Sequence, residues 1–173
     1  MKLTDSYGRI HDYIRISLID KCNLNCIYCN PQNQLVNSSK RDAILSYEEL
    51  IRLITILVRD LEVRKIRFTG GEPLIRKNIL TFFQMLSHVR EEYPFEIGIT
   101  TNGTQLEDKI KSLHSSGVNK MNISLDTLQR NKFIAITGKD LLETTLRSIE
   151  KAAQVNFQSV KINAVIIKNI NDD

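Results

Sequence analysis

Short strand-like segments alternate with helix-like segments along most of this chain. This alternation limits the possible fold classes more than any other feature of the sequence. β-Branched and alternating apolar residues predict strands at about residues 13–18, 63–68, 95–99, 121–125 and 159–167. Apolar residues at helical spacing predict helices at about residues 46–61, 77–92, 106–115 and 142–153. Strands that are separated by crossover helices run parallel, so the sequence predicts the α/β class.

Two α/β architectures fit this order, a doubly wound sheet and a (β/α) barrel. Polar or glycine-rich segments follow the predicted strands, at the rim where barrel enzymes carry their sites, and no G-x-G-x-x-G follows the first strand. A complete eight-fold barrel takes about 250 residues, whereas this chain has 173. We therefore predict a partial, open (β/α) barrel of parallel strands that stops after about the fifth strand. No linker interrupts the pattern, so residues 1–173 form a single domain.

The composition is that of a globular protein, with 42% hydrophobic and 25% charged residues. No apolar run is long enough for a membrane span, and the first residues lack the apolar core of a signal peptide. We expect a cytoplasmic protein that contacts no membrane. The net charge of +4 suits an anionic small ligand and does not require nucleic acid as a partner.

All three cysteines of the chain, Cys22, Cys26 and Cys29, fall within eight residues directly after the first predicted strand. An odd, clustered set makes a poor disulfide framework but a good set of metal ligands. A structural zinc ion normally takes four protein ligands, and the sequence has no fourth cysteine. Unliganded buried cysteines are a second interpretation, although the flanking residues are polar. The third is a [4Fe–4S] cluster that leaves one iron open to a substrate or cofactor.

The spacing Cys22-x3-Cys26-x2-Cys29, with the aromatic Tyr28 before the last cysteine, resembles the signature of radical S-adenosylmethionine (SAM) enzymes. The segment Thr69-Gly70-Gly71-Glu72-Pro73 resembles the glycine-rich motif of the same superfamily. Further segments are similar to the GTP 3′,8-cyclase family of molybdenum cofactor biosynthesis: residues 3–9, 15–22, 66–74, 100–103, 122–128, 133, 136–138, 160–163 and 169–173. The resemblance thus covers almost the whole chain.

This resemblance implies the fold of a radical SAM core and a [4Fe–4S] cluster held by Cys22, Cys26 and Cys29. It implies cleavage of SAM to methionine and a 5′-deoxyadenosyl radical, which takes the 3′ hydrogen from the ribose of GTP. It also implies contacts to SAM from Tyr28, Gly70, Gly71, Glu72 and Ser124. The two glycines suit a close approach of the backbone to the methionine part of SAM, because they lack Cβ.

Arg15, Arg67 and Lys161 lie on predicted strands among mostly apolar neighbours. The pattern alone leaves two placements open, an outward surface with ion pairs and the inside of the barrel. The resemblance places all three inward, together with Thr100, as contacts to GTP. It further implies an electron donor such as flavodoxin, the next enzyme of the molybdopterin pathway and a second copy in a homodimer as partners.

The family also carries a second cluster on three more cysteines in a C-terminal region, which is absent from this sequence. We expect either part of a longer family member or a short relative that binds only SAM. Two other functions stay open, a radical SAM enzyme acting on a peptide or other substrate and a non-catalytic module that binds the cluster or SAM.

Overall fold

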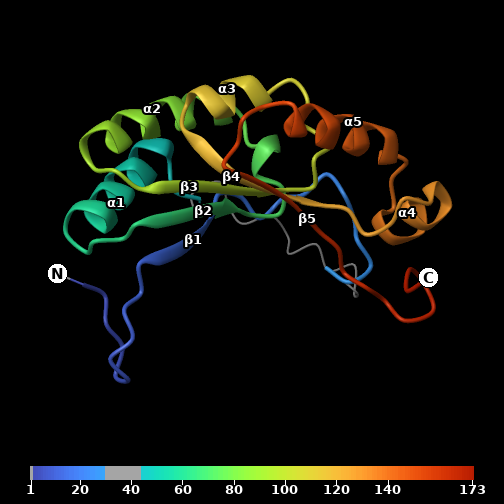
Figure 1. The fold of residues 1–173 in the computed structure, drawn as a ribbon, viewed down its shortest axis with the longest axis horizontal. Helices are drawn as coiled ribbons and strands as arrows, with labels where there is room; N and C mark the ends of the chain where they lie inside the picture. The colour runs from blue at the N-terminus through green and yellow to red at the C-terminus, as the bar shows by residue number, and fades with distance from the viewer. Residues whose placement is uncertain (1, 30–43) are drawn as a thin grey trace.

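The computed structural model describes residues 2–29 and 44–173. Its five strands form one sheet in the order of the chain, β1-β2-β3-β4-β5, with every neighbouring pair parallel (Figure 1). The strands are β1 (Tyr13–Ser17), β2 (Lys65–Thr69), β3 (Glu96–Thr101), β4 (Val118–Ser124) and β5 (Ser159–Asn163). A doubly wound sheet reverses its strand order, whereas the wall of a barrel does not. The predicted partial (β/α) barrel is confirmed.

Helices α1, α2, α3 and α5 lie along the convex side of the arched sheet (Figure 1). The helical elements are α1 (Tyr47–Arg59), the 3₁₀ turn η2 (Pro73–Ile75), α2 (Ile79–Glu92), α3 (Ile110–Ser115), α4 (Arg130–Thr137) and α5 (Leu142–Ala153). Helix α1 begins where the sequence predicts, because Ser46 and Glu49 cap each other's backbone N–H groups at 3.2 and 2.7 Å. No helix of the described residues is long and apolar enough to cross a membrane.

The two faces of the sheet differ in character, because side chains alternate along each strand. On the helix side Phe68, Ile99 and Ile123 are fully buried and pack with Phe82 and Phe83 of α2 into one core. On the concave side, one row across neighbouring strands carries Arg15, Arg67, Gly98 and Lys120. A second row carries Thr100, Asn122 and Lys161. The apolar face forms the core with the helices, so the polar side chains of the concave face are not needed for packing.

Two local differences from the sequence expectation have physical reasons. Helix α4 lies in a segment without a predicted helix, because it has only eight residues, little apolar periodicity and no side-chain N-cap. Strand β5 ends at Asn163 and not near residue 167. Its one neighbour among the described residues, β4, ends at Ser124, which pairs with Asn163, so the backbone beyond Asn163 has no strand to pair with.

The N-terminal arm, residues 2–12, projects from the β1 edge of the sheet (Figure 1). An antiparallel bridge joins Thr4 to Ile10, and the carboxylate of Asp5 closes the arm. Asp5 accepts hydrogen bonds from the backbone N–H groups of Tyr7 and Arg9 at 2.9 and 3.0 Å, and an ion pair from Arg9 Nε at 2.7 Å. These donors, with the backbone of Arg9 first, lower the pKa of Asp5 to about 2.

Ionised Asp5 favours the folded arm, so its contribution is complete above the usual carboxyl pKa near 4 and is lost as the pH falls through about 2. We predict that the backbone amide signals of Tyr7 and Arg9 titrate together near pH 2 in an NMR series. Asp5→Asn should abolish that transition while leaving the amides of α2 unchanged. A midpoint close to 4 would contradict the described arm.

Candidate functional site

The loops after β1, β2 and β3 meet at the carboxyl edge of the sheet. Cys22, Cys26 and Cys29 follow β1 and are unpaired thiols, of which Cys26 is half-buried and the other two are exposed. A turn brings the backbone N–H of Cys29 to the carbonyl of Cys26 at 3.0 Å. Because the strands are parallel, the segments after β2 and β3 reach the same edge as the cysteines.

Gly70 and Gly71 seat the end of β2 against the segment that leads into the cysteines. A Cβ on Gly71 would lie 2.2 Å from the carbonyl oxygen of Lys21, and one on Gly70 would lie 2.5 Å from that of Ile19. The backbone N–H of Gly71 donates to Ile19 at 2.7 Å. The glycines therefore have a role within the chain itself, and their predicted contact with SAM stays a prediction.

Glu72 is fully buried and ties the end of β2 to the end of β3. Oε1 accepts from Thr101 Oγ1 at 2.8 Å and from the backbone of Leu74 at 3.0 Å, and Oε2 accepts from the backbone of Asn102 at 2.7 Å. Burial raises the pKa of Glu72, and the three hydrogen bonds act in the opposite direction. With these bonds its carboxylate positions the loop after β3, so any contact with SAM would come from its backbone.

Asn102 joins the loop after β3 to the cysteine loop. Its Nδ2 donates to Asn23 Oδ1 at 2.9 Å and lies 3.7 Å from Cys22 Sγ. Asn23 in turn donates to Thr104 Oγ1 at 2.8 Å. Side chains 79 to 81 positions apart thereby hold the first cysteine in place.

The other end of the cysteine loop is held by Tyr28 and by α4. The hydroxyl of Tyr28 donates to Asp126 Oδ2 at 2.8 Å, and burial with this bond raises the pKa of the phenol. The backbone N–H groups of Asn25 and Ile27 donate to the C-terminal carbonyls of α4 at 2.9 and 3.0 Å. The cysteine loop thus rests on three separate parts of the chain.

The four residues that the sequence analysis assigned to GTP all lie on the concave face. Arg15 and Lys161 are exposed, and within the described residues neither makes a side-chain hydrogen bond or ion pair. Arg67 is already fixed, since it donates to the hydroxyl of Tyr13 at 3.1 Å and to the carbonyl of Ile99 at 3.2 Å.

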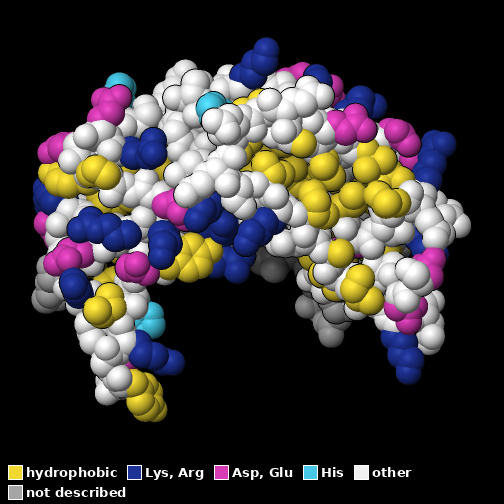
Figure 2. All heavy atoms as spheres, viewed as in Figure 1, with side chains coloured by type: hydrophobic (Ala, Val, Ile, Leu, Met, Phe, Trp, Pro, Cys, Tyr) yellow, Lys and Arg dark blue, Asp and Glu magenta, His cyan; other side chains and the backbone are white. Residues whose placement is uncertain are grey.

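Arg67 crosses the next strand at Gly98, where a Cβ would stand only 3.0 Å from the guanidinium carbon. A glycine in β3 therefore allows this cation to lie flat on the sheet. The Oγ1 atom of Thr100 is buried and has no hydrogen-bond partner among the described residues. Figure 2 shows Lys and Arg side chains gathered at the rim of the hollow beneath the sheet. Ser124 lies on the same face at the end of β4.

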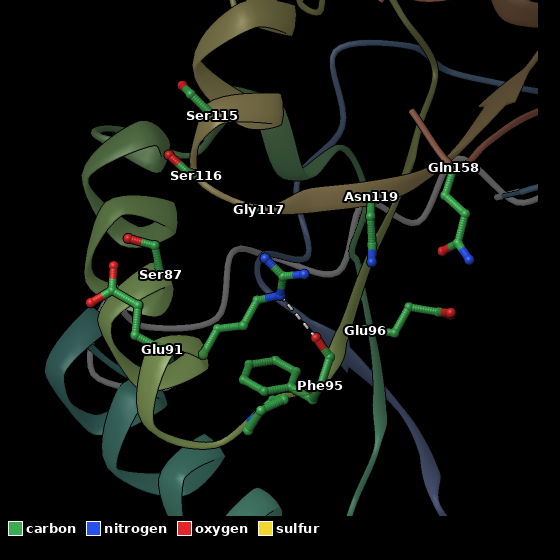
Figure 3. Close-up of a pocket in the computed structure, with 11 residues that line it drawn as sticks. Ser87, Glu91, Phe95, Glu96, Ser115, Ser116, Gly117, Asn119 and Gln158 are labelled. Carbon is green, nitrogen blue, oxygen red and sulfur yellow. Dashed lines mark hydrogen bonds between the residues drawn. The ribbon is translucent and has the colours of Figure 1, made fainter. Parts of the chain in front are cut away.

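A cavity of about 560 Å³ lies at the opposite edge, where β3 and β4 begin (Figure 3). Arg90 reaches into it from the end of α2, and its Nε donates to the carbonyl of Phe95 at 3.1 Å. A Cβ on Gly117, which has φ +89°, would stand 2.8 Å from Arg90 Nη1. This arrangement ties α2 to the start of the strands and lies far from the cysteines.

Comparison with known proteins identifies the family. The model of the radical SAM superfamily matches residues 16–173. This chain belongs to the radical SAM superfamily. Radical SAM proteins take their name from SAM and work with a [4Fe–4S] cluster, so the fold, the superfamily and the cofactors assigned from the sequence are confirmed.

Several curated relatives are similar to this radical SAM chain over almost all of its length. GTP 3′,8-cyclase of Thermodesulfovibrio yellowstonii is 45% identical over 99% of this chain and 52% of its own. Molybdenum cofactor biosynthesis protein 1 of Dictyostelium discoideum is 44% identical over 98% of this chain and 26% of its own. GTP 3′,8-cyclase of Campylobacter lari is 40% identical over 98% of this chain and 51% of its own. The chain spans about half the length of the two cyclases.

Solved structures show the same fold. The His-tagged anSMEcpe with bound AdoMet aligns with a TM-score of 0.72 at 20% identity, over 91% of this chain and 44% of that one. Methylornithine synthase aligns with a TM-score of 0.66 at 16% identity, over 93% of this chain and 46% of that one. At these identities the likeness establishes the radical SAM fold alone.

The cysteine loop fits the superfamily's cluster in its donor chemistry. Burial, followed by the nearby Cys29, raises the pKa of the Cys26 thiol to about 11, and burial with Cys22 raises that of Cys29. Crowded thiols of this kind become ligands when positive metal charge is present. Within the described residues, no three His, Cys, Asp or Glu side chains could hold one metal ion together. A [4Fe–4S] cluster does not require three side chains around one ion, because each thiolate binds a different iron.

Sequence reasoning missed Asn102, Asp126 and α4 as supports of the radical SAM site. Asn102 was recognised only as part of a matching segment, because its partners lie far away in the sequence. One signal was present: Asp126 directly follows a predicted strand and Asn102 lies three residues beyond another, at the edge where a barrel carries its site. Helix α4 gives no comparable signal.

We predict that Glu72→Ala lowers the free energy of unfolding by about 3 kcal/mol, because three donors would lose their buried acceptor. Urea denaturation followed by circular dichroism measures the change. Glu91→Ala, at an exposed position of α2, serves as the control and should leave stability within about 0.5 kcal/mol. Equal stability of the two variants would contradict the role of Glu72.

Proposed function

We propose that this chain cleaves SAM reductively and directs the radical to GTP, as a GTP 3′,8-cyclase. The observation that carries the proposal is the pairing of a three-cysteine loop with a basic, hydroxyl-bearing concave face on one sheet edge. The 40–45% identity to curated GTP 3′,8-cyclases over nearly the whole chain supports the choice of substrate.

In this proposal Cys22, Cys26 and Cys29 hold the cluster. When bound, the cluster supplies the electron that breaks a carbon–sulfur bond of SAM. The edge around Tyr28, Gly70, Gly71, Glu72 and Ser124 binds SAM and orients it. Tyr28 is held by Asp126, so its backbone and ring present a fixed wall to the cofactor. The buried carboxylate of Glu72 keeps the neighbouring loop rigid.

GTP lies on the concave face in this proposal. Arg15 and Lys161 have charged groups without a partner among residues 2–29 and 44–173; these groups suit phosphate oxygens, and the bidentate fork of an arginine matches them well. Arg67 offers the donors that Tyr13 and Ile99 leave available. The unpartnered hydroxyl of Thr100 supplies a neutral hydrogen bond in a dry position. Together they hold the ribose near SAM and exclude water from the radical.

The reaction requires partners beyond GTP. A one-electron donor such as flavodoxin delivers the electron, and the next enzyme of the molybdopterin pathway takes the product. A cytoplasmic location suits three unpaired cysteines, because thiols stay reduced there. A homodimer completes this set of proposed partners.

The proposal is tested by reconstituting the chain anaerobically with iron and sulfide and adding dithionite and SAM. We expect about four irons per chain and 5′-deoxyadenosine formation that rises when GTP is added. Cys26→Ala should abolish iron binding and 5′-deoxyadenosine together. Formation that ignores GTP would leave a radical SAM enzyme with another substrate, such as a peptide. A loaded cluster without cleavage would overturn the enzymatic proposal.

We predict opposite effects for two neighbouring threonines. Thr100→Val removes a buried hydroxyl that has no partner in the described part of the chain, so the free energy of unfolding should stay equal or rise by up to about 1 kcal/mol. Its affinity for GTP should fall about tenfold in calorimetric titrations, as expected for one lost hydrogen bond of about 1.4 kcal/mol.

Thr101→Val is the matched control, because its hydroxyl bonds to Glu72 on the other face. It should lower the free energy of unfolding by about 1–2 kcal/mol and leave GTP affinity unchanged. Unaltered GTP binding by Thr100→Val would remove Thr100 from the proposed substrate site.

A further inference from the structure

We propose that Asn102 is a positioning residue that acts through Cys22 and tunes the reduction potential of the cluster. Its amide Nδ2 lies 3.7 Å from Cys22 Sγ, within the range of an N–H···S hydrogen bond. The inference rests on the proposed function only in that the three cysteines bind a cluster. It concerns a residue outside the sets assigned to cluster, SAM and GTP.

The contacts of Asn102 fix which side of its amide faces the sulfur. Oδ1 accepts from the backbone N–H of Thr104 at 3.0 Å and from its hydroxyl at 2.7 Å. A flipped amide would turn its NH₂ group toward the Thr104 N–H, donor against donor. The NH₂ group therefore points to Asn23 Oδ1, at 2.9 Å, and to Cys22.

The backbone of Asn102 is equally constrained. Its N–H donates to the buried carboxylate of Glu72 at 2.7 Å, and its carbonyl accepts from Thr145 Oγ1 of α5 at 3.3 Å. The side chain thus stands on a support that reaches from the β2 turn to α5. A donor held this rigidly loses little entropy when it bonds to a thiolate, which is what a lasting effect on a cluster requires.

A hydrogen bond to a ligand sulfur draws electron density from the cluster and favours its reduced state. Cys22 Sγ has a second donor, the backbone N–H of Leu24 at 3.4 Å. Loss of Asn102 therefore leaves a liganding, partly solvated thiolate, so its removal should shift the potential and not release the iron. A more negative potential makes the cluster harder to reduce.

The experiment compares anaerobically reconstituted wild-type chain with Asn102→Ala and Asn102→Asp. Iron content is measured first, and the midpoint potential is then determined by redox titration followed by electron paramagnetic resonance. Both variants should load iron like the wild type. We expect Asn102→Ala to lower the reduction equilibrium constant about tenfold, or ~59 mV for one electron. Asn102→Asp should lower it further, because it adds a negative charge.

Asn156→Ala and Asn156→Asp are the matched controls, since Asn156 is exposed and precedes β5 at the opposite edge of the sheet. Both should keep the wild-type potential. An Asn102→Ala cluster with the wild-type potential would overturn the inference. Folded Asn102 variants that take up no iron would also overturn it, because they would show a role in binding and not in tuning. A wild-type chain without iron would instead overturn the proposed function.

Discussion

The carboxylate of Glu72 is the interaction on which the site depends. It is fully buried, yet three donors satisfy it, from the turn after β2, the last residue of β3 and the loop after β3. A buried carboxylate with so many partners costs less than an unpaired one, but it also fixes the relative position of everything that bonds to it. Glu72 fixes the loop after β3, and the side chain of Asn102 in that loop in turn contacts the cysteine loop. The cysteines are exposed or half-buried, and the beginning of their loop, with Cys22, is positioned from this interior group.

The glycine pair and Glu72 act as one unit. Gly70 and Gly71 bring the end of β2 so close to residues 19–21 that any side chain would collide with their carbonyls. This contact lets the backbone of Glu72 bond to Lys21 at 2.8 Å while its side chain turns inward. The motif that resembles a cofactor cradle is therefore first a joint between two loops. A cofactor bound at this edge would meet a surface that the chain has already fixed.

Sequence patterns correctly predicted the parts of this molecule that depend on local periodicity. The order of strands and helices and the capping box of Ser46 and Glu49 follow from residues close together in the chain. The contacts of Asn102 with Cys22 and Asn23 join positions about 80 residues apart, and no local pattern encodes them. Helix α4 was not predicted, because it is stabilised by tertiary contacts with the cysteine loop and not by its own amphipathicity. The placement of Arg15 and Lys161 needed the structure to decide between two faces.

Two adjacent residues of β3 point to opposite faces of the sheet and therefore have different surroundings. Thr101 points toward the helix side and bonds to Glu72, whereas Thr100 points to the concave side and finds no partner among the described residues. An unsatisfied buried hydroxyl lowers the stability of the isolated chain. A bound molecule that makes a hydrogen bond to it would remove this cost. Arg67, which lies flat over Gly98, and the exposed side chains of Arg15 and Lys161, which pair with no acid among the described residues, make this face positively charged. The same sheet thereby packs one face into the core and leaves the other face polar and positively charged.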